Sequence, residues 1–209
     1  MRILKQIALG VLALVALLAV VGLFIPRKYS VERSVTIQAP ADLIFPYVND
    51  LKKQQEWSPW KAMDPSAKMT FGPVTEGQGA SYSWEGDKTG HGTCTILSTE
   101  AGKGIETDLD FKEMGRASGY FKLIPEGTAV VVTEGFKGDA GWNLMRRYMN
   151  LIVDRMVGPV FEQGLTKLKE ITETEFTKAL EQQKTIQEAA ATADAEPAAA
   201  VGKAKSKSK

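Results

Sequence analysis

The chain has 209 residues, with 26 basic against 25 acidic side chains and a formal net charge of +1. This even balance, without a basic cluster on any predicted strand or helix, argues against nucleic acid as a partner. Cys94 is the only cysteine and His91 the only histidine. These counts exclude an intramolecular disulfide, a cysteine-based zinc site and a histidine-dependent catalytic triad. We therefore expect neither a metal nor a cofactor.

The chain begins with a long apolar segment. No charge interrupts it from Ile7 to Ile25, and a helix of this length spans nearly the ~30 Å of a bilayer's hydrocarbon core. A cleaved signal peptide is the alternative, but its apolar region should be shorter and end in small residues, unlike Leu23-Phe24-Ile25. Residues 1–28 are therefore predicted to be an uncleaved single-pass anchor in the inner (cell) membrane. Basic residues flank both ends, and we expect the domain on the periplasmic or extracytoplasmic side.

After the anchor, alternating apolar residues predict a first strand over Tyr29–Ile37. Ala39-Pro40 then opens a helix, in which Pro46 predicts a bend or an early end. A second short helix is expected over Lys52–Glu56, and Pro59 should force the chain to extend after it.

Glycines and prolines at strand-like spacing predict six more antiparallel strands, joined by short turns. They are expected near Lys68–Phe71, Ala80–Glu85, Gly92–Glu100, Ile105–Phe111, Ala117–Pro125 and Thr128–Lys137. From Asn143 the period changes to that of a long helix, which Gly158-Pro159 should kink. The helix is predicted to fade after about Phe176, leaving residues 177–209 as a disordered Ala/Glu/Lys-rich tail.

This element order, β-α-α-β6-α, excludes a doubly wound sheet and is typical of an α+β domain. Several segments strengthen the assignment: Val35–Pro40, Leu43–Phe45, Val48–Leu51, Glu56–Trp60, Met63–Pro65, Gly79–Gly86, Gly158-Pro159 and Phe161-Glu162. In these segments the chain resembles the START-like (SRPBCC) superfamily, the polyketide cyclase/dehydrase and lipid transport family, in a bacterial membrane-anchored branch. The resemblance implies a helix-grip fold over residues 29–176, in which a seven-stranded curved antiparallel sheet surrounds a long C-terminal helix.

An apolar pocket is expected between the sheet and the C-terminal helix, because a curved sheet closed by a helix leaves a cavity. Its candidate lining comes from the entry turn, from two strands and from the long helix. The candidates are Trp57, Trp60, Tyr82, Trp84, Glu134, Phe136, Met145, Met149, Ile152 and Met156. Each of the apolar candidates has a competing interpretation as simple core filling, and Glu134 is interpreted as a lone carboxylate inside the pocket.

Other polar residues are interpreted more plainly. Asp108 and Asp110 share one side of a strand and are expected to face water, although an inward-facing pair could act as general acid and base. His91 lies between two glycines in a predicted solvated turn. Cys94 is expected to be a small buried residue, since no basic group is placed to lower its pKa.

Three functions remain open. The first is a membrane-anchored binding protein that holds a hydrophobic small molecule or lipid. The second is a cyclase- or dehydratase-like enzyme, which the resemblance permits, with Glu134 or the Asp108/Asp110 pair as base. The third is an envelope scaffold with a vestigial pocket, whose tail contacts an unknown protein partner. The binding protein is the preferred hypothesis, and no catalytic residue is assigned.

Overall fold

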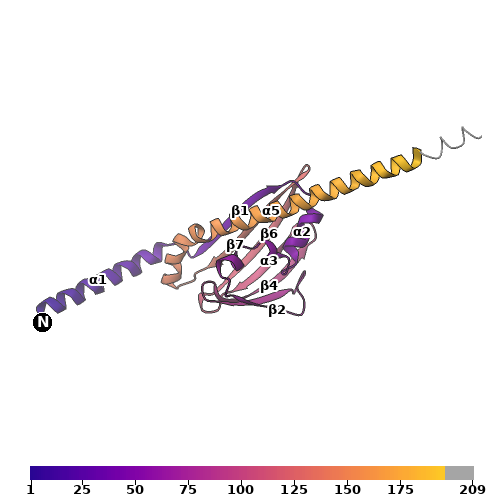
Figure 1. Ribbon diagram of the computed structural model, residues 1–209. Coiled ribbons are helices and arrows are strands. Elements are labelled where there is room, and N and C mark those ends of the chain that lie inside the picture. Colours follow the sequence, from indigo (N-terminus) through magenta and orange to yellow (C-terminus); the bar gives the residue numbers. More distant parts are fainter. Residues whose placement is uncertain (196–209) are drawn as a thin grey trace, which may run out of the picture.

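A computed structural model describes residues 1–195 of the chain (Figure 1). The elements follow the predicted order, with one helix before the domain and short helices after β1. They are α1 (Arg2–Phe24), β1 (Lys28–Ile37), α2 (Ala41–Asn49), α3 (Gln54–Trp57), α4 (Trp60–Met63), β2 (Lys68–Phe71), β3 (Ser81–Gly86), β4 (Gly90–Glu100), β5 (Gly104–Asp110), η1 (Lys112–Met114), β6 (Arg116–Glu126), β7 (Ala129–Asp139) and α5 (Leu144–Ala195).

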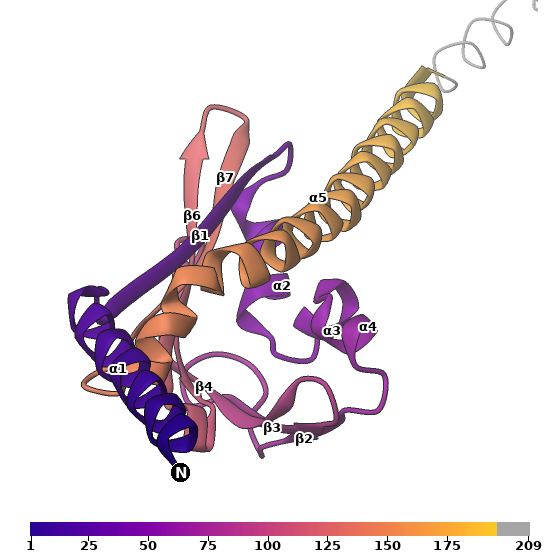
Figure 2. The ribbon, with the colours of Figure 1, turned by 90° about the vertical axis from the view of Figure 1, so that its left-hand side faces the viewer.

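The strands form one seven-stranded sheet in the order β1-β7-β6-β5-β4-β3-β2, and every neighbouring pair is antiparallel. Each link but one joins strands that follow each other in the sequence, so hairpins build most of the sheet. The exception places β1 beside β7, with Val35 opposite Val132. Figure 2 shows the sheet curving away from α5 toward β2 and β3. The predicted α+β helix-grip fold is confirmed.

The core lies between α5, α2 and the β1–β7 end of the sheet. Leu165 and Leu168 of α5 are almost fully buried, as are Ile44 of α2 and Val132 of β7. They belong to one apolar cluster. A second cluster joins Phe161 of α5 to strands β1, β6 and β7. Burial of these side chains holds α5 across one end of the sheet, because burying each large apolar side chain contributes roughly 1.5–3 kcal/mol to the free energy of folding.

Helix α5 is longer than predicted. It runs without interruption from Leu144 to Ala195, so the expected fading after Phe176 is wrong for the described part, and residues 196–209 of the predicted tail lie outside the described residues. The physical reason is composition, because Ala, Glu, Gln and Lys favour helix even without an apolar stripe. Pro159 lies within α5, and Figure 2 shows the bend in its first part that a proline predicts (Figure 2).

The two prolines near the domain's start act differently from one another. Pro46 lies inside α2, which ends three residues later at Asn49, in agreement with the predicted short helix. The chain is extended at Ser58, directly before Pro59, as expected, but only for this residue, and Pro59 then begins a further short helix that was not predicted. Pro59 forms the N-cap of this helix, α4, a position that proline tolerates because it needs no backbone donor.

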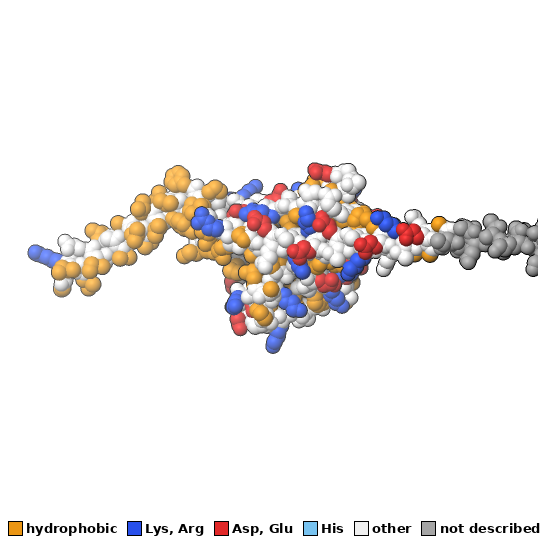
Figure 3. Space-filling view, turned by 45° about the horizontal axis from the view of Figure 1, so that its top comes forward, with side chains coloured by type: hydrophobic (Ala, Val, Ile, Leu, Met, Phe, Trp, Pro, Cys, Tyr) orange, Lys and Arg blue, Asp and Glu red, His pale blue; other side chains and the backbone are white. Residues whose placement is uncertain are grey.

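Helix α1 is apolar on all sides, and its large side chains are exposed. Figure 3 shows it projecting from the body as an almost uninterrupted hydrophobic surface (Figure 3). Within the described residues, it is the one helix long and apolar enough to cross a membrane. Its C-terminal end packs on α5 through Gly22, the buried residue of α1.

Candidate functional site

The concave face of the sheet is only partly covered. Helix α5 lies over β1 and β7, whereas β2 to β4 curve away from it (Figure 2). Several large inward-facing side chains therefore stay partly exposed although they pack against the core. We name this set the aromatic cup: Phe71, Tyr82, Trp84, Leu109, Phe111, Phe121 and Glu134. Apolar and aromatic side chains on a concave, partly uncovered surface are the usual lining of a small-molecule site.

Four rings of the cup form a continuous strip along β2, β3 and the end of β5. The ring centroids are 5.9 Å apart between Phe71 and Tyr82, and 5.9 Å apart between Tyr82 and Trp84. Trp84 then meets Phe111 edge-on at 5.7 Å. Such tilted and edge-on contacts are favourable geometries for aromatic pairs. The strip thus forms a firm apolar wall, and Tyr82 and Trp84 lie on it as the sequence predicted for neighbours on one strand face.

Glu134 introduces a carboxyl group into this apolar surrounding. It lies in β7 between Phe121 of β6 and Arg33 of β1 in the strand register. Burial raises its pKa to about 8. Within residues 1–195 no side chain forms a hydrogen bond or ion pair with it. A buried carboxyl group without a partner is costly when ionised, so Glu134 is mostly protonated at neutral pH.

Arg33 lies opposite Glu134 in the strand register, but its guanidinium is bound by carboxylates of α5. Its guanidinium donates to Asp154 at 2.8 and 3.1 Å and to Glu162 at 2.6 Å, both on α5. These two acceptors raise the pKa of Arg33. Because the guanidinium is turned toward α5, Glu134 is left without a counter-ion.

Polar groups from the neighbouring strands lie close to the same space. Burial raises the pKa of Tyr82, and the proximity of Cys94 and Glu134, whose ionised forms would repel a phenolate, acts in the same direction. Burial also raises the pKa of the Cys94 thiol to about 12. Tyr82 and Cys94 are therefore neutral, and with Glu134 they provide hydrogen-bonding groups inside an apolar cup.

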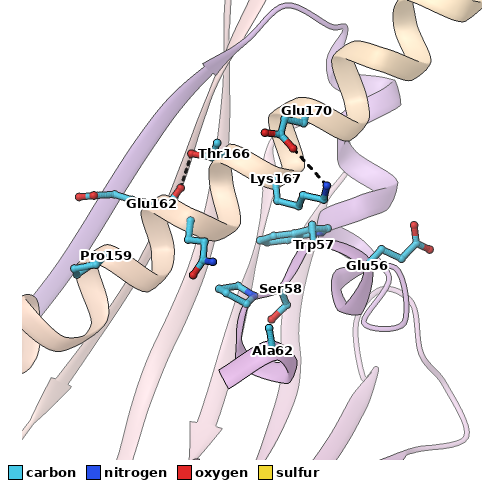
Figure 4. A pocket seen from close by; sticks show the side chains of 11 residues that line it. Glu56, Trp57, Ser58, Ala62, Pro159, Glu162, Thr166, Lys167 and Glu170 are labelled. Carbon is cyan, nitrogen blue, oxygen red and sulfur yellow. Dashed lines mark hydrogen bonds and ion pairs between the residues drawn. The ribbon is translucent and has the colours of Figure 1, made fainter. Parts of the chain in front are cut away.

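A second hollow lies between α5 and the α3–α4 segment. It is an open cleft of about 590 Å³, and Figure 4 shows Trp57 on one side and the α5 side chains on the other (Figure 4). The residues that line it are Glu56, Trp57, Ser58, Pro59, Ala62, Pro159, Glu162, Gln163, Thr166, Lys167 and Glu170. Its lining mixes apolar groups with several charges, which suits an entrance better than a dry ligand chamber.

Trp57 forms the wall between the cleft and the cup. Its ring lines the cleft and also meets Phe121 edge-on, with the centroids 5.8 Å apart. The indole N–H donates to the carbonyl oxygen of Tyr47 at 3.0 Å. The Trp57 ring also lies close to the backbone of α5 at Gly164. A larger residue would crowd it there, since an added Cβ would lie 3.3 Å from the ring.

Other predicted lining residues lie outside the cup. Trp60 is 38% exposed at the start of α4 and does not line the cleft. Phe136 is buried against Phe161 at 5.9 Å and fills the core under α5. The core interpretation thus holds for Phe136.

The stripe on α5 was predicted to face the cup, and this prediction is wrong. Met145 is 75%, Met149 48%, Ile152 42% and Met156 58% exposed. The first part of α5 buries a different face, with Val153 and Val157 packed toward the sheet. The helix has more than one apolar stripe here, and the periodicity alone does not say which one meets the sheet.

The remaining polar residues agree with their plain interpretations. Asp108 accepts a hydrogen bond from Arg116 at 2.5 Å, and Asp110 accepts one from the backbone N–H of Lys112 at 2.8 Å. Both aspartates lie on the outer side of β5. His91 is exposed as expected and pairs with Glu113 at 3.2 Å, but it lies in strand β4 opposite Glu85 and not in the predicted turn. Cys94 is buried.

Sequence reasoning missed three rings of the cup, namely Phe71, Phe111 and Phe121. The signal was present for Phe121, which alternates with Gly119 and Leu123 in a predicted strand. Phe111 sits opposite no strand partner, one residue after β5 ends, so its position depends on the three-dimensional path of the turn. The cleft residues of α5 were missed because they are polar and gain meaning only from the proximity of α3 and α4.

A curved sheet that grips a helix and leaves an aromatic interior with few polar groups defines a protein of the helix-grip class. A family model described as polyketide cyclase / dehydrase and lipid transport matches residues 28–173. Since this match spans most of the chain, the chain belongs to that family. No curated protein matches the sequence.

Solved structures share the fold at low sequence identity. Protein CV1439 from Chromobacterium violaceum is similar with a TM-score of 0.51 and 13% identity, over 69% of this chain and 96% of that chain. Norcoclaurine synthase from Thalictrum flavum, in complex with a transition-state analogue, has a TM-score of 0.53 and 11% identity, over 71% and 96%. The di-domain ARO/CYC protein StfQ of the steffimycin pathway gives 0.52 and 12%, over 71% of this chain and 51% of its own.

Proposed function

We propose that the chain is a membrane-anchored binding protein that holds a hydrophobic small molecule or lipid in the aromatic cup, with α1 as a single-pass anchor in the cell membrane. The observation behind the proposal is the partial exposure of inward-facing rings, which belong to strands but are not covered by α5. Exposed aromatic surface inside a fold is unfavourable unless a ligand covers it. Membership of a lipid transport family supports the same class of ligand.

The role of Glu134 follows from its protonation. With a pKa raised to about 8 by burial, the carboxyl group donates a hydrogen bond at neutral pH. We infer that it meets a carbonyl or hydroxyl oxygen of the ligand, while the rings of Tyr82, Trp84 and Phe121 contact its apolar part. A single polar contact inside an apolar site fixes the orientation of the ligand.

The anchor raises the local concentration of the cup at the membrane, where hydrophobic molecules partition. Exposed charges are absent along the span from Ile7 to Phe24, and the domain follows directly at Lys28. We propose that the domain lies outside the cytoplasm, with the N-terminus inside.

Native mass spectrometry of the full-length chain, purified in a mild detergent, tests the binding proposal. A co-purified small molecule is expected on the wild type. Leu109→Trp should fill the cup and remove that molecule. Leu97→Trp is the matched control, because Leu97 lies on the neighbouring strand but is 51% exposed on the outer side, and it should keep the molecule. Equal adducts on wild type and Leu109→Trp would count against the cup as the site.

An enzymatic function is the second candidate, favoured by one observation. A lone carboxyl group whose pKa is about 8 exchanges its proton near neutral pH, as a general acid or base requires. The same mass spectra separate the two functions. A dehydratase, or a cyclase that also dehydrates, should hold a molecule heavier by one water after Glu134→Gln, because the hydrated substrate accumulates in place of the product. A binding protein should hold the same molecule, with lower occupancy.

A further inference from the structure

Seven large apolar side chains are exposed where α5 begins, namely Leu151, on the side of α5 that faces α1, and six others. We name these six others the apolar patch: Met114, Trp142, Met145, Met149, Ile152 and Met156. Trp142 is 78% exposed, the highest value of the tryptophans in this chain, and Met145 is 75% exposed. Several large exposed apolar side chains gathered at one end of a domain indicate an interaction surface. The patch lies outside the aromatic cup and the cleft, so the proposed binding role does not explain it.

The patch is a separate face of α5. Met145, Met149, Ile152 and Met156 recur at intervals of four, three and four residues, which places them on one side of the helix. Val153 and Val157 pack toward the sheet from another side. Leu144 and Tyr148 face α1 from a third. The first part of α5 therefore has three apolar sides, and the side with Met145, Met149, Ile152 and Met156 is the exposed one.

Helix α1 meets α5 beside this face. An added Cβ at Gly22 would lie 3.1 Å from the Tyr148 ring and 3.2 Å from Leu144, so the two helices touch there. The Tyr148 hydroxyl donates to the carbonyl oxygen of Leu18 at 2.6 Å. Arg147, which is buried, donates to the carbonyl oxygen of Leu23 at 3.0 Å. The bond from Arg147 satisfies the carbonyl of Leu23, which lies in the last turn of α1 and has no partner within the helix.

The contact between α1 and α5, which we call the joint, fixes the position of the patch along the axis of α1. The α1 carbonyls that α5 contacts extend from Leu18 to Leu23, which at about 1.5 Å per residue is roughly 8 Å of helix. Helices that lie in a membrane interface bury their apolar face about 5–10 Å deep. Figures 1 and 2 both show the first part of α5 crossing the end of α1 instead of continuing along it. A helix that crosses the end of a spanning helix lies close to the membrane plane.

Figure 3 shows the hydrophobic surface of α1 continuing onto the adjoining body. Exposed cations border the same region, including Lys28 and Arg155. We propose that the apolar patch is a membrane-interface surface, so that the start of α5 and the Trp142 side chain lie in the headgroup region of the bilayer that α1 crosses. The inference rests on the proposed anchor. Trp at this depth is typical of membrane interfaces, and the cations meet phospholipid phosphates.

The consequence is a fixed orientation of the domain. Two contacts with the bilayer, through α1 and through the patch, prevent the body from tilting freely about the linker Ile25–Arg27. The aromatic cup is then held at a constant height above the lipid surface, where a hydrophobic ligand can pass between the bilayer and the protein.

Site-directed spin labelling of the full-length chain tests the proposal. In a Cys94→Ala background, single cysteines replace Leu14 in α1, Met149 in the patch and Ile186 in distal α5. Ile186 is the matched control, since it is also apolar and 68% exposed on the same helix. The chain is placed in vesicles of phosphatidylethanolamine and phosphatidylglycerol, and the accessibility of each label to oxygen and to a water-soluble nickel complex is measured.

The proposal predicts that the labels at 14 and 149 are accessible to oxygen and protected from nickel, and that the label at 186 shows the reverse. A label at 149 that behaves like the one at 186, with 14 in lipid, overturns the patch but leaves the anchor intact. If the label at 14 is also aqueous, the anchor itself fails. Spin coupling between labels at 149 that disappears on dilution with unlabelled chain would assign the patch to a second copy and overturn the proposal.

Discussion

The indole of Trp57 and the ring of Phe121 meet edge-on with 5.8 Å between their centroids. This contact joins the α3–α4 segment to the middle of the sheet, and it is the point where cleft and cup are closest. Trp57 is 5% exposed and its N–H is satisfied by Tyr47, so both its apolar area and its hydrogen bond contribute to stability.

Trp57→Ala should lower the free energy of unfolding by about 3–5 kcal/mol, because a large buried side chain is removed and a cavity remains. Chemical denaturation of the full-length chain in detergent measures this loss. Trp60→Ala is the control, since Trp60 is 38% exposed, and its effect should stay within about 0.5 kcal/mol. Similar losses for the two variants would contradict the distinct roles of these tryptophans.

The pKa of Glu134 makes stability depend on pH. Its folded value, about 8, lies above the ordinary value of 4.5, so between these values the folded state keeps a proton that the unfolded chain has lost. Stability should therefore fall as pH rises from about 4.5 to about 8, and this contribution should then level off. Denaturation midpoints of wild type and Glu134→Gln across this range provide the test, and the variant should show a flatter profile. Parallel profiles would mean that Glu134 titrates at its ordinary pKa.

The strand pattern of this chain could be predicted from sequence because the strands have one solvent-exposed and one buried face. Val35, for example, lies between the polar residues Ser34 and Thr36 and is paired with Val132 in the register. The partner of β1 could not be derived in the same way, since pairing with the last strand depends on closure of the whole sheet.

The candidate site was harder to predict because it depends on which side of α5 covers the sheet and which strands stay uncovered. Tyr82 and Trp84 belong to the cup as expected, but the stripe from Met145 to Met156 faces away from it. A helix that contacts a sheet on one side and α1 on another has two buried faces, and hydropathy does not rank them. Glu134 was identified correctly as an inward-facing carboxylate, whereas the absence of a partner depends on Arg33 turning toward α5.

The joint between α1 and α5 depends on the small size of Gly22. Gly22→Leu should force the helices apart, because an added Cβ would already lie 3.1 Å from Tyr148. Loosening should expose the following linker, so trypsin should cleave faster after Arg27 and Lys28 in chain held in vesicles. Gly10→Leu is the matched control in the same helix, since no atom lies within 4 Å of its added Cβ, and its cleavage rate should equal that of the wild type. Equal rates for both variants would show that the joint does not protect the linker.

The distal part of α5 projects beyond the domain, and it does not contribute to the stability of the domain. Every side chain from Thr177 to Ala191 is exposed, and Figure 1 shows this part of the helix projecting beyond the sheet on the side opposite α1. A segment that buries no apolar area against the body does not stabilise it, however well its alanines and glutamates favour helix. Deleting residues 181–209 should therefore leave the melting temperature unchanged within about 1 °C while the circular dichroism signal of helix decreases. A fall of several degrees, about 2–4 °C for each kcal/mol lost in a domain of this size, would mean that the distal helix contacts the body in solution. An unchanged melting temperature would instead leave this helix free to reach a partner away from the membrane.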